Sequence, residues 1–254
     1  MSKSIKIRNM ELGVGLPKIC VPIIGEDETA VLREVEAAIK AGADLIEWRA
    51  DRYQSVFEEE KTQALGAKIR ERLGDTPMLF TFRTEDTEKV TALTDYIEIN
   101  KWAMDSIKMD LIDFESAKGD KLCTDLCQYA HRKGIVSVLS NHDFKETPDK
   151  DVIVERLCKM HELGADVPKI AVVPNSARDV LTLLLATERY AREYAEGPFI
   201  TMSMKGMGSV SRISGELFGS ALTFGATKKG SAPGQLNIAD LKEMLRIMHK
   251  QILG

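Results

Sequence analysis

The chain has 254 residues, of which 44% are hydrophobic and 29% charged, the composition of a globular protein with a substantial core. Thirty-five basic and thirty-nine acidic residues give a formal net charge of −4 with no basic block, which argues against a nucleic-acid partner. No apolar run reaches the length of a membrane span and the N-terminus lacks an apolar signal core, so we expect a cytoplasmic protein without a membrane partner.

The four cysteines, Cys20, Cys123, Cys127 and Cys158, include no CxxC spacing. They therefore give little support to a metal site, and we expect none. Small buried thiols in a reducing compartment are the simpler interpretation.

Residues 4 to 13 alternate in hydrophobicity around an Arg8-Asn9 turn, which predicts a short β-hairpin. From there, short apolar runs alternate with amphipathic segments, the pattern of βα units. We predict eight strands, at 18–24, 43–51, 77–83, 109–115, 134–143, 166–173, 198–204 and 222–226. The predicted helices are 28–41, 56–73, 88–101, 120–133, 150–163, 177–195, 210–218 and 238–253, with Asp149 and Asn237 as candidate N-caps.

Eight alternations in a chain of this length favour a single (β/α)8 TIM barrel over a doubly wound sheet. The first strand is followed by Gly25-Glu26-Asp27, which is not a dinucleotide-binding fingerprint. We expect one domain over residues 1–254, in which 1–16 form a hairpin that closes the barrel bottom and 17–254 form eight βα units.

Polar side chains stand late in several predicted strands, where parallel barrels build their active sites. They are Glu47, Arg49, Arg83, Asp113, Glu115, His142 and Lys169. Cations and carboxylates in this set could neutralise one another. For Asp113 alone, a salt bridge on the solvated rim is an equally good interpretation.

Lys169 lies within the apolar run 167–173, where a buried ammonium must be paired or lose its proton. An unprotonated lysine is a nucleophile, and a salt-bridged core lysine is the structural alternative. His142 ends the preceding strand, so the two side chains could share a cleft.

Glycine-rich loops follow the last two strands, at 205–212 and 228–235. In barrels these two loops often form an anion pocket. Arg212 could hold a carboxylate bidentately, while Ser231 and Gln235 supply neutral hydrogen bonds. Glycines in the segment 228–236 would permit it to hinge as a lid, which the sequence leaves open.

Several motifs together resemble the type I 3-dehydroquinate dehydratases of the shikimate pathway, over nearly the whole chain. They are Pro17-Lys18-Ile19-Cys20-Val21, Glu47-Trp48-Arg49-Ala50-Asp51, Phe80-Thr81-Phe82-Arg83, Ser140-Asn141-His142-Asp143, Pro168-Lys169-Ile170-Ala171, Ser211-Arg212 and Ser231-Ala232-Pro233-Gly234-Gln235. The resemblance implies a Schiff-base hydro-lyase without metal or organic cofactor. Lys169 would attack the C3 ketone of 3-dehydroquinate, and His142 would act as general base and then general acid.

The same resemblance implies the remaining roles. Arg212, Ser231 and Gln235 would bind the substrate carboxylate and a nearby hydroxyl. Glu47, Arg49 and Arg83 would hold the C4 and C5 hydroxyls, and the protein would be a homodimer.

The chain departs from the family pattern at two places. Pro22 stands where the family often has a serine late in the first strand. The family also pairs its histidine with a glutamate after the third strand, where Glu85, Asp86 and Glu88 offer no unambiguous match here.

Two other functions are weighed against the dehydratase. Another Schiff-base barrel, such as an aldolase-type lyase, would also need a lysine on the sixth strand but would not obviously need Ser-Asn-His-Asp on the fifth. A catalytically silent, metabolite-binding barrel is the second alternative, and the intact Lys169 and His142 argue against it.

Overall fold

The computed structural model describes residues 3–85, 92–227 and 234–254. Its main sheet contains nine parallel strands in the order β11-β10-β3-β4-β5-β6-β7-β8-β9. They are β3 (Lys18–Ile23), β4 (Leu45–Arg49), β5 (Met78–Thr81), β6 (Leu111–Glu115), β7 (Val136–Asp143), β8 (Val167–Val172), β9 (Ile200–Ser203), β10 (Leu222–Ala226) and β11 (Leu236–Asn237). The sheet curls into a ring, and the Ala221 N–H donates to the Phe199 carbonyl at 2.9 Å where β9 and β10 begin.

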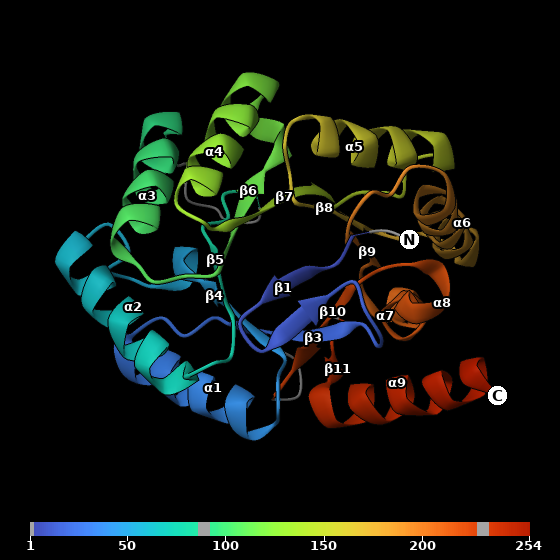
Figure 1. The fold of residues 1–254 in the computed structure, drawn as a ribbon, viewed down its shortest axis with the longest axis horizontal. Coiled ribbons are helices and arrows are strands. Elements are labelled where there is room, and N and C mark those ends of the chain that lie inside the picture. The colour runs from blue at the N-terminus through green and yellow to red at the C-terminus, as the bar shows by residue number, and fades with distance from the viewer. Residues whose placement is uncertain (1–2, 86–91, 228–233) are drawn as a thin grey trace.

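Helices follow one another around this ring in chain order (Figure 1). They are α1 (Glu28–Lys40), α2 (Glu59–Leu73), α3 (Leu93–Ser106), α4 (Asp120–Arg132), α5 (Lys150–Glu162), α6 (Ala177–Glu193), α7 (Ser209–Ile213), α8 (Gly215–Phe218) and α9 (Ile238–Leu253). The predicted (β/α)8 barrel is confirmed. None of the helices within the described ranges is both long and apolar enough to cross a membrane.

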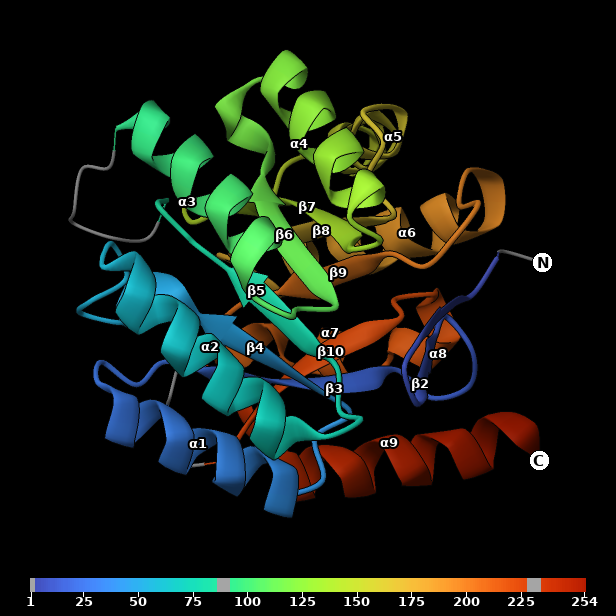
Figure 2. The ribbon, with the colours of Figure 1, turned by 60° about the vertical axis from the view of Figure 1, so that its left-hand side comes forward.

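The predicted N-terminal hairpin consists of β1 (Ile5–Ile7) and β2 (Met10–Leu12), which pair antiparallel. Its buried side chains Ile7, Met10 and Leu12 join an apolar cluster inside the strand ring. Figure 1 shows the hairpin across the middle of the ring, and Figure 2 shows it toward one end of the strands. The hairpin therefore closes the bottom of the barrel, because that cluster contains the first inward-facing residue of most strands.

Strand alternation separates two cores. Outward residues such as Ile46 and Trp48 pack in the large cluster with the helices, while Leu45 of the same strand faces the ring interior. Above this lower apolar layer the inward positions become polar. The register aligns Glu115 of β6 with Ser140 of β7, and Ser140 with Lys169 of β8, so the polar positions lie at similar heights.

Three predictions about local structure need correction. The helix expected at 210–218 is two short helices that break at Ser214, whose hydroxyl donates to the Val210 carbonyl at 2.7 Å and competes with regular helical bonding. Asn237 caps α9 as predicted, by accepting from Ala239 N, but the Asp149 side chain makes no capping bond. The third helix, expected at 88–101, is described from Leu93 to Ser106 and so ends five residues later, while its expected start at 88 lies outside the described residues.

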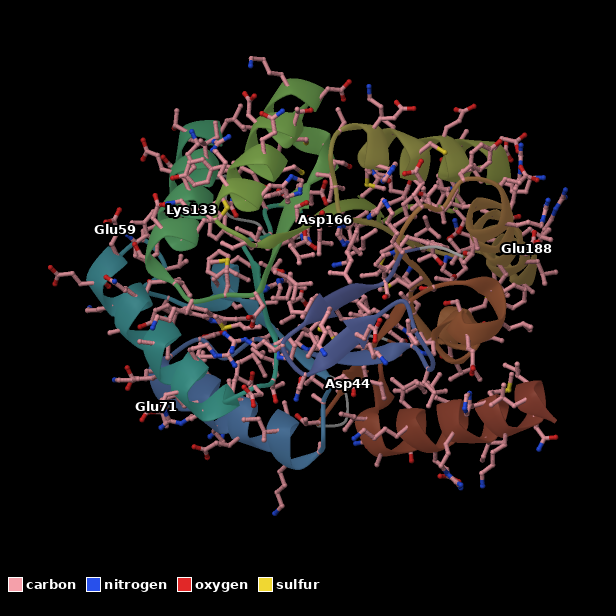
Figure 3. All side chains as sticks on the ribbon, viewed as in Figure 1. Asp44, Glu59, Glu71, Lys133, Asp166 and Glu188 are labelled. Carbon is pink, nitrogen blue, oxygen red and sulfur yellow. The ribbon has the colours of Figure 1, made fainter. Side chains whose placement is uncertain are left out.

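Short elements at the strand ends escaped prediction. They are β11 and three 3-10 turns, η1 (Ala50–Arg52), η2 (Ser116–Lys118) and η3 (Gly206–Gly208). Away from the site, charged side chains point outward from the helices, as Glu59, Glu71 and Glu188 do in Figure 3.

Candidate active site

A cavity of about 570 Å³ opens at the carboxyl ends of the strands, a size suited to a small-molecule ligand. Seven of the eight predicted site residues line it: Glu47, Arg49, Arg83, His142, Lys169, Arg212 and Gln235. The eighth, Ser231, lies outside the described residues. The barrel thus brings together side chains from β4, the segment after β5, β7, β8 and α7.

The Lys169 amine lies deep in this cavity. Its Nζ donates to Asp113 Oδ2 at 2.9 Å and is 4.0 Å from Glu47 Oε1. It also lies over the Phe224 ring, 4.9 Å from the centroid. A close carboxylate and an aromatic face thus hold the amine where it lines the cavity.

Asp113 is the centre of this charge cluster. Only 1% of the residue is exposed, so its interpretation as a solvated rim salt bridge is wrong. Its Oδ1 accepts from Arg83 Nη2 at 2.6 Å and from the Ser140 hydroxyl at 2.6 Å. Arg83 completes the triangle by donating from Nη1 to Ser140 at 2.8 Å.

The charges of this cluster reinforce one another. Burial would raise the pKa of Asp113, but the Arg83 and Lys169 cations outweigh it and hold that pKa below its usual range. Burial likewise opposes the charge of Arg83, yet Asp113 and Glu115 raise its pKa above the usual value. Both groups are therefore fixed as ions.

His142 has a carboxylate partner, which the sequence left open among three residues. Its Nδ1 lies 3.1 Å from Glu85 Oε2, while Asp86 and Glu88 lie outside the described residues. When Glu85 is ionised its carboxylate can only accept, so Nδ1 then carries the proton and Nε2 is left as a base. Phe144 stacks on the imidazole at 5.7 Å between ring centroids.

Burial shifts both members of this pair. Desolvation, with the cations of Arg83 and Lys169, holds the pKa of His142 well below its usual range. Desolvation also raises the pKa of Glu85 to about 7, partly offset by Arg83. At neutral pH the imidazole is uncharged and ready to accept a proton.

Glu47 and Arg49 lie on one face of β4, as alternation predicted. Glu47 Oε1 accepts from the Thr81 hydroxyl at 2.8 Å, and Arg49 forms a bidentate pair with Asp51 at 2.8 and 2.9 Å. Pro22 aligns with Glu47 across the sheet and lines the cavity, where it presents only apolar atoms.

Arg212 also lines the cavity and is only 4% exposed. Within the described ranges it makes no ion pair, and its Nε has no hydrogen-bond partner. Its Nη1 lies 4.0 Å from the Met202 sulfur, and burial alone lowers its pKa. A buried guanidinium in this state is a ready site for an anion.

The two glycine-rich loops meet beside Arg212. Lys205 adopts a positive φ of 59° and lines the cavity. A Cβ on Gly234 would overlap the Lys205 backbone, so only glycine permits this approach. Whether the segment 228–236 closes as a lid stays a prediction, because 228–233 lie outside the described part.

The sequence named two members of this site without deciding their roles. Glu85 lies two residues beyond Arg83, and Asp113 lies two residues before Glu115 and two beyond Leu111. Strict alternation would have put them on the inward face. Among the described residues, no three His, Cys, Asp or Glu side chains are grouped to hold a metal ion.

The fold and the site together define a (β/α)8 barrel equipped for chemistry on a small acid: a buried amine, an adjacent imidazole and carboxylate pair, and a guanidinium open to an anion. The family model of type I 3-dehydroquinase matches residues 19–252. The chain belongs to this family.

Individual relatives agree over the full length. The chain is 44% identical to the 3-dehydroquinate dehydratase of Clostridioides difficile (99% of this chain, 100% of the relative) and 46% identical to that of Salmonella typhimurium (98% and 99%). It superimposes with a TM-score of 0.96 on the Clostridium difficile type I enzyme crystallised with covalently modified comenic acid, at 44% identity, with 99% of this chain and 100% of that one covered. The Geobacillus kaustophilus enzyme gives 0.93 at 37% identity, with 98% and 97% covered.

Proposed function

We propose that this chain dehydrates 3-dehydroquinate to 3-dehydroshikimate through an imine on Lys169. The observation that carries the proposal is the buried Lys169 amine, which shares one cavity with His142. The names of the full-length relatives support the same reaction and disfavour the aldolase-type and silent alternatives.

The first step joins the amine to the ketone. The Lys169 ammonium gives up a proton as its nitrogen adds to C3 of the substrate, and the ketone oxygen leaves as water with that proton and a second one from the nitrogen, so a protonated imine remains. Asp113 already lies 2.9 Å from Nζ and is held as a carboxylate, so it faces the cation before and after the bond forms. The iminium withdraws electrons from C2 and acidifies its proton.

His142 then moves one proton twice. Its Nε2 takes the C2 proton, and the electron pair passes to the iminium nitrogen as an enamine forms. Return of that electron pair expels the C1 hydroxyl, which leaves as water with the proton from His142. Hydrolysis of the imine releases the conjugated product and restores the Lys169 amine.

The other side chains orient the substrate. Arg212, with Gln235 and Ser231, holds the carboxylate, and Glu47 and Arg49 hold the C4 and C5 hydroxyls. Arg83 also holds these C4 and C5 hydroxyls. Its Nη atoms bond Asp113 and Ser140, so Arg83 orients the carboxylate that holds the Lys169 amine as well.

The test is to mix the protein with 3-dehydroquinate and follow the absorbance of the conjugated enone, with and without a chelator. We expect turnover in both cases, none for Lys169→Ala, and severe loss for His142→Ala. Full turnover by either variant, or dependence on a metal, would overturn the proposal. Lys121→Ala, which changes an exposed lysine, is the matched control.

We also propose a single-domain homodimer in the cytoplasm. All four cysteines are free thiols, which suits a reducing compartment. The insertion of hairpin side chains into the barrel interior supports one folding unit. The dimer rests on the family resemblance, and light scattering of the purified chain would test it by mass.

A further inference from the structure

Three successive backbone amides follow β5, and each donates to a buried carboxylate. The Arg83 N–H donates to Asp51 Oδ1 at 3.2 Å. The N–H groups of Thr84 and Glu85 both donate to Glu115 Oε1, at 2.8 and 2.9 Å. No strand or helix covers this stretch, so these bonds satisfy its donors.

Glu115 is built for this contact. Its other oxygen accepts from the Thr84 hydroxyl at 2.6 Å and lies 3.3 Å from Lys118 Nζ. Its own N–H donates to the Tyr96 hydroxyl at 2.9 Å, so the carboxylate is presented from an anchored backbone. The residue is 1% exposed and does not line the cavity.

The Glu85 side chain depends on that backbone. Its carboxylate lies 3.1 Å from His142 Nδ1 and 3.9 Å from Arg83 Nη1. A fixed Glu85 amide also fixes the Cα position from which the Glu85 side chain reaches and orients the imidazole. We propose that Glu115 is a positioning residue: it clamps the 84–85 amides so that Glu85 holds His142 for proton transfer. This inference rests on the proposed function.

The clamp acts on one half of the chemistry. The surroundings of the Lys169 amine are Asp113, Glu47 and Phe224, and Glu115 is not among them. Glu115 Oε1 also lies 3.6 Å from Arg83 Nη1, but Arg83 keeps its closer bonds to Asp113 and Ser140 when Glu115 is changed. Loss of the clamp should therefore spare imine formation and slow proton removal. A merely structural role would damage both steps together.

Three substitutions separate position from charge. Glu115→Gln keeps an acceptor oxygen for both amides but removes the charge, whereas Glu115→Asp keeps the charge and shortens the reach by one methylene. Glu115→Ala removes both. We expect near-normal kcat for Glu115→Gln and kcat lower by about 10- to 100-fold for Glu115→Asp and Glu115→Ala, with KM little changed and imine trapping by borohydride retained.

A double-mutant cycle with Glu85→Ala gives the decisive readout. If Glu115 acts through Glu85, the variant with both residues changed to alanine is no slower than Glu85→Ala alone. Additive losses, equal losses for Gln and Asp at 115, or joint loss of trapping and turnover would overturn the inference. If Glu115→Ala does not fold, the Gln and Asp pair carries the test by itself.

Failure of the proposed function is recognised separately. It would appear as absence of turnover or of trapping at Lys169 in the unaltered chain. If only the inference about Glu115 is wrong, the unaltered chain still turns over substrate and is still trapped at Lys169.

Discussion

Two groups of residues at the cavity differ in how their buried charges are compensated. The ion-paired wall consists of Glu47, Arg83 and Lys169, and the buried Asp113 bonds the two cations, so each cation has a carboxylate within 4.0 Å. The open wall consists of Met202, Met204, Arg212 and Phe224, and its guanidinium forms no ion pair in the part of the chain that the structure describes. The ion-paired wall fixes the positions of the reacting groups, and the open wall offers a guanidinium to which an anion can bind.

The difference follows from what each wall must do. Buried ions that stay paired cost little further reorganisation when chemistry begins, because their partners already face them. A buried guanidinium without an anion destabilises the folded protein, and a bound carboxylate restores the missing interaction. Removal of an ion from the ion-paired wall should therefore lower folding stability, whereas removal of the guanidinium from the open wall should not.

The largest expected effect is on the ion-paired wall. Asp113→Ala leaves Arg83 and Lys169 facing each other without their shared carboxylate. We expect the free energy of unfolding to fall by about 3–5 kcal/mol, as when one partner of a buried ion pair is removed. Urea titration measures it, with Asp125→Ala, an exposed carboxylate, as control. A loss no greater than in the control would show that the two walls do not differ.

The open wall should respond differently. Arg212→Met removes the guanidinium but keeps an apolar side chain beside Met202, so we expect no loss of folding stability. Removal of a charged hydrogen-bond partner of the substrate should raise KM by about 10- to 150-fold, equivalent to roughly 1.5–3 kcal/mol. Steady-state kinetics and urea titration of the same variant provide both numbers. An unchanged KM would move the carboxylate site elsewhere, and Arg178→Met, at an exposed position, is the control.

A smaller effect, on pH dependence, sharpens the description of the His142 pair. The pKa of Glu85 is raised to about 7, so the carboxyl gains a proton as the pH falls through that value. A protonated Glu85 donates to Nδ1 and leaves the proton of His142 on Nε2, which then cannot act as a base. We expect kcat/KM to fall below about pH 7 in the unaltered chain.

Glu85→Gln supplies the matched comparison for this pH profile. The amide does not titrate, so the limb near pH 7 should disappear while kcat is reduced at all pH values. Persistence of the same limb in Glu85→Gln would assign it to another group. The measurement is a profile of kcat/KM against pH for both proteins.

Periodicity and motif resemblance were enough to predict the barrel and to select seven residues that line its cavity. The period-two alternation placed Glu47 and Arg49 on one face, and the glycine-rich loops after the last strands drew attention to Arg212 and Gln235, which line the same cavity. These features are local in sequence, so a single chain displays them.

Contacts across the ring could not be predicted in the same way. Asp113 could have been a rim salt bridge, because its partners come from the segment after β5 and from β8, far away in sequence. The partner of His142 stayed open because three carboxylates follow Arg83, and only the backbone after β5 selects Glu85. Alternation along a strand predicts the face on which a side chain lies, whereas the neighbouring strands determine which residues that side chain contacts.

The most direct test of the central claim is covalent trapping. Incubation with 3-dehydroquinate and borohydride, followed by peptide mass mapping, should place the reduced adduct on Lys169 alone. Lys169→Ala should remain unmodified, while His142→Ala should still be trapped because it forms the imine and stalls at proton removal. An adduct on another lysine, or an unmodified Lys169 in a protein that turns over substrate, would contradict the account.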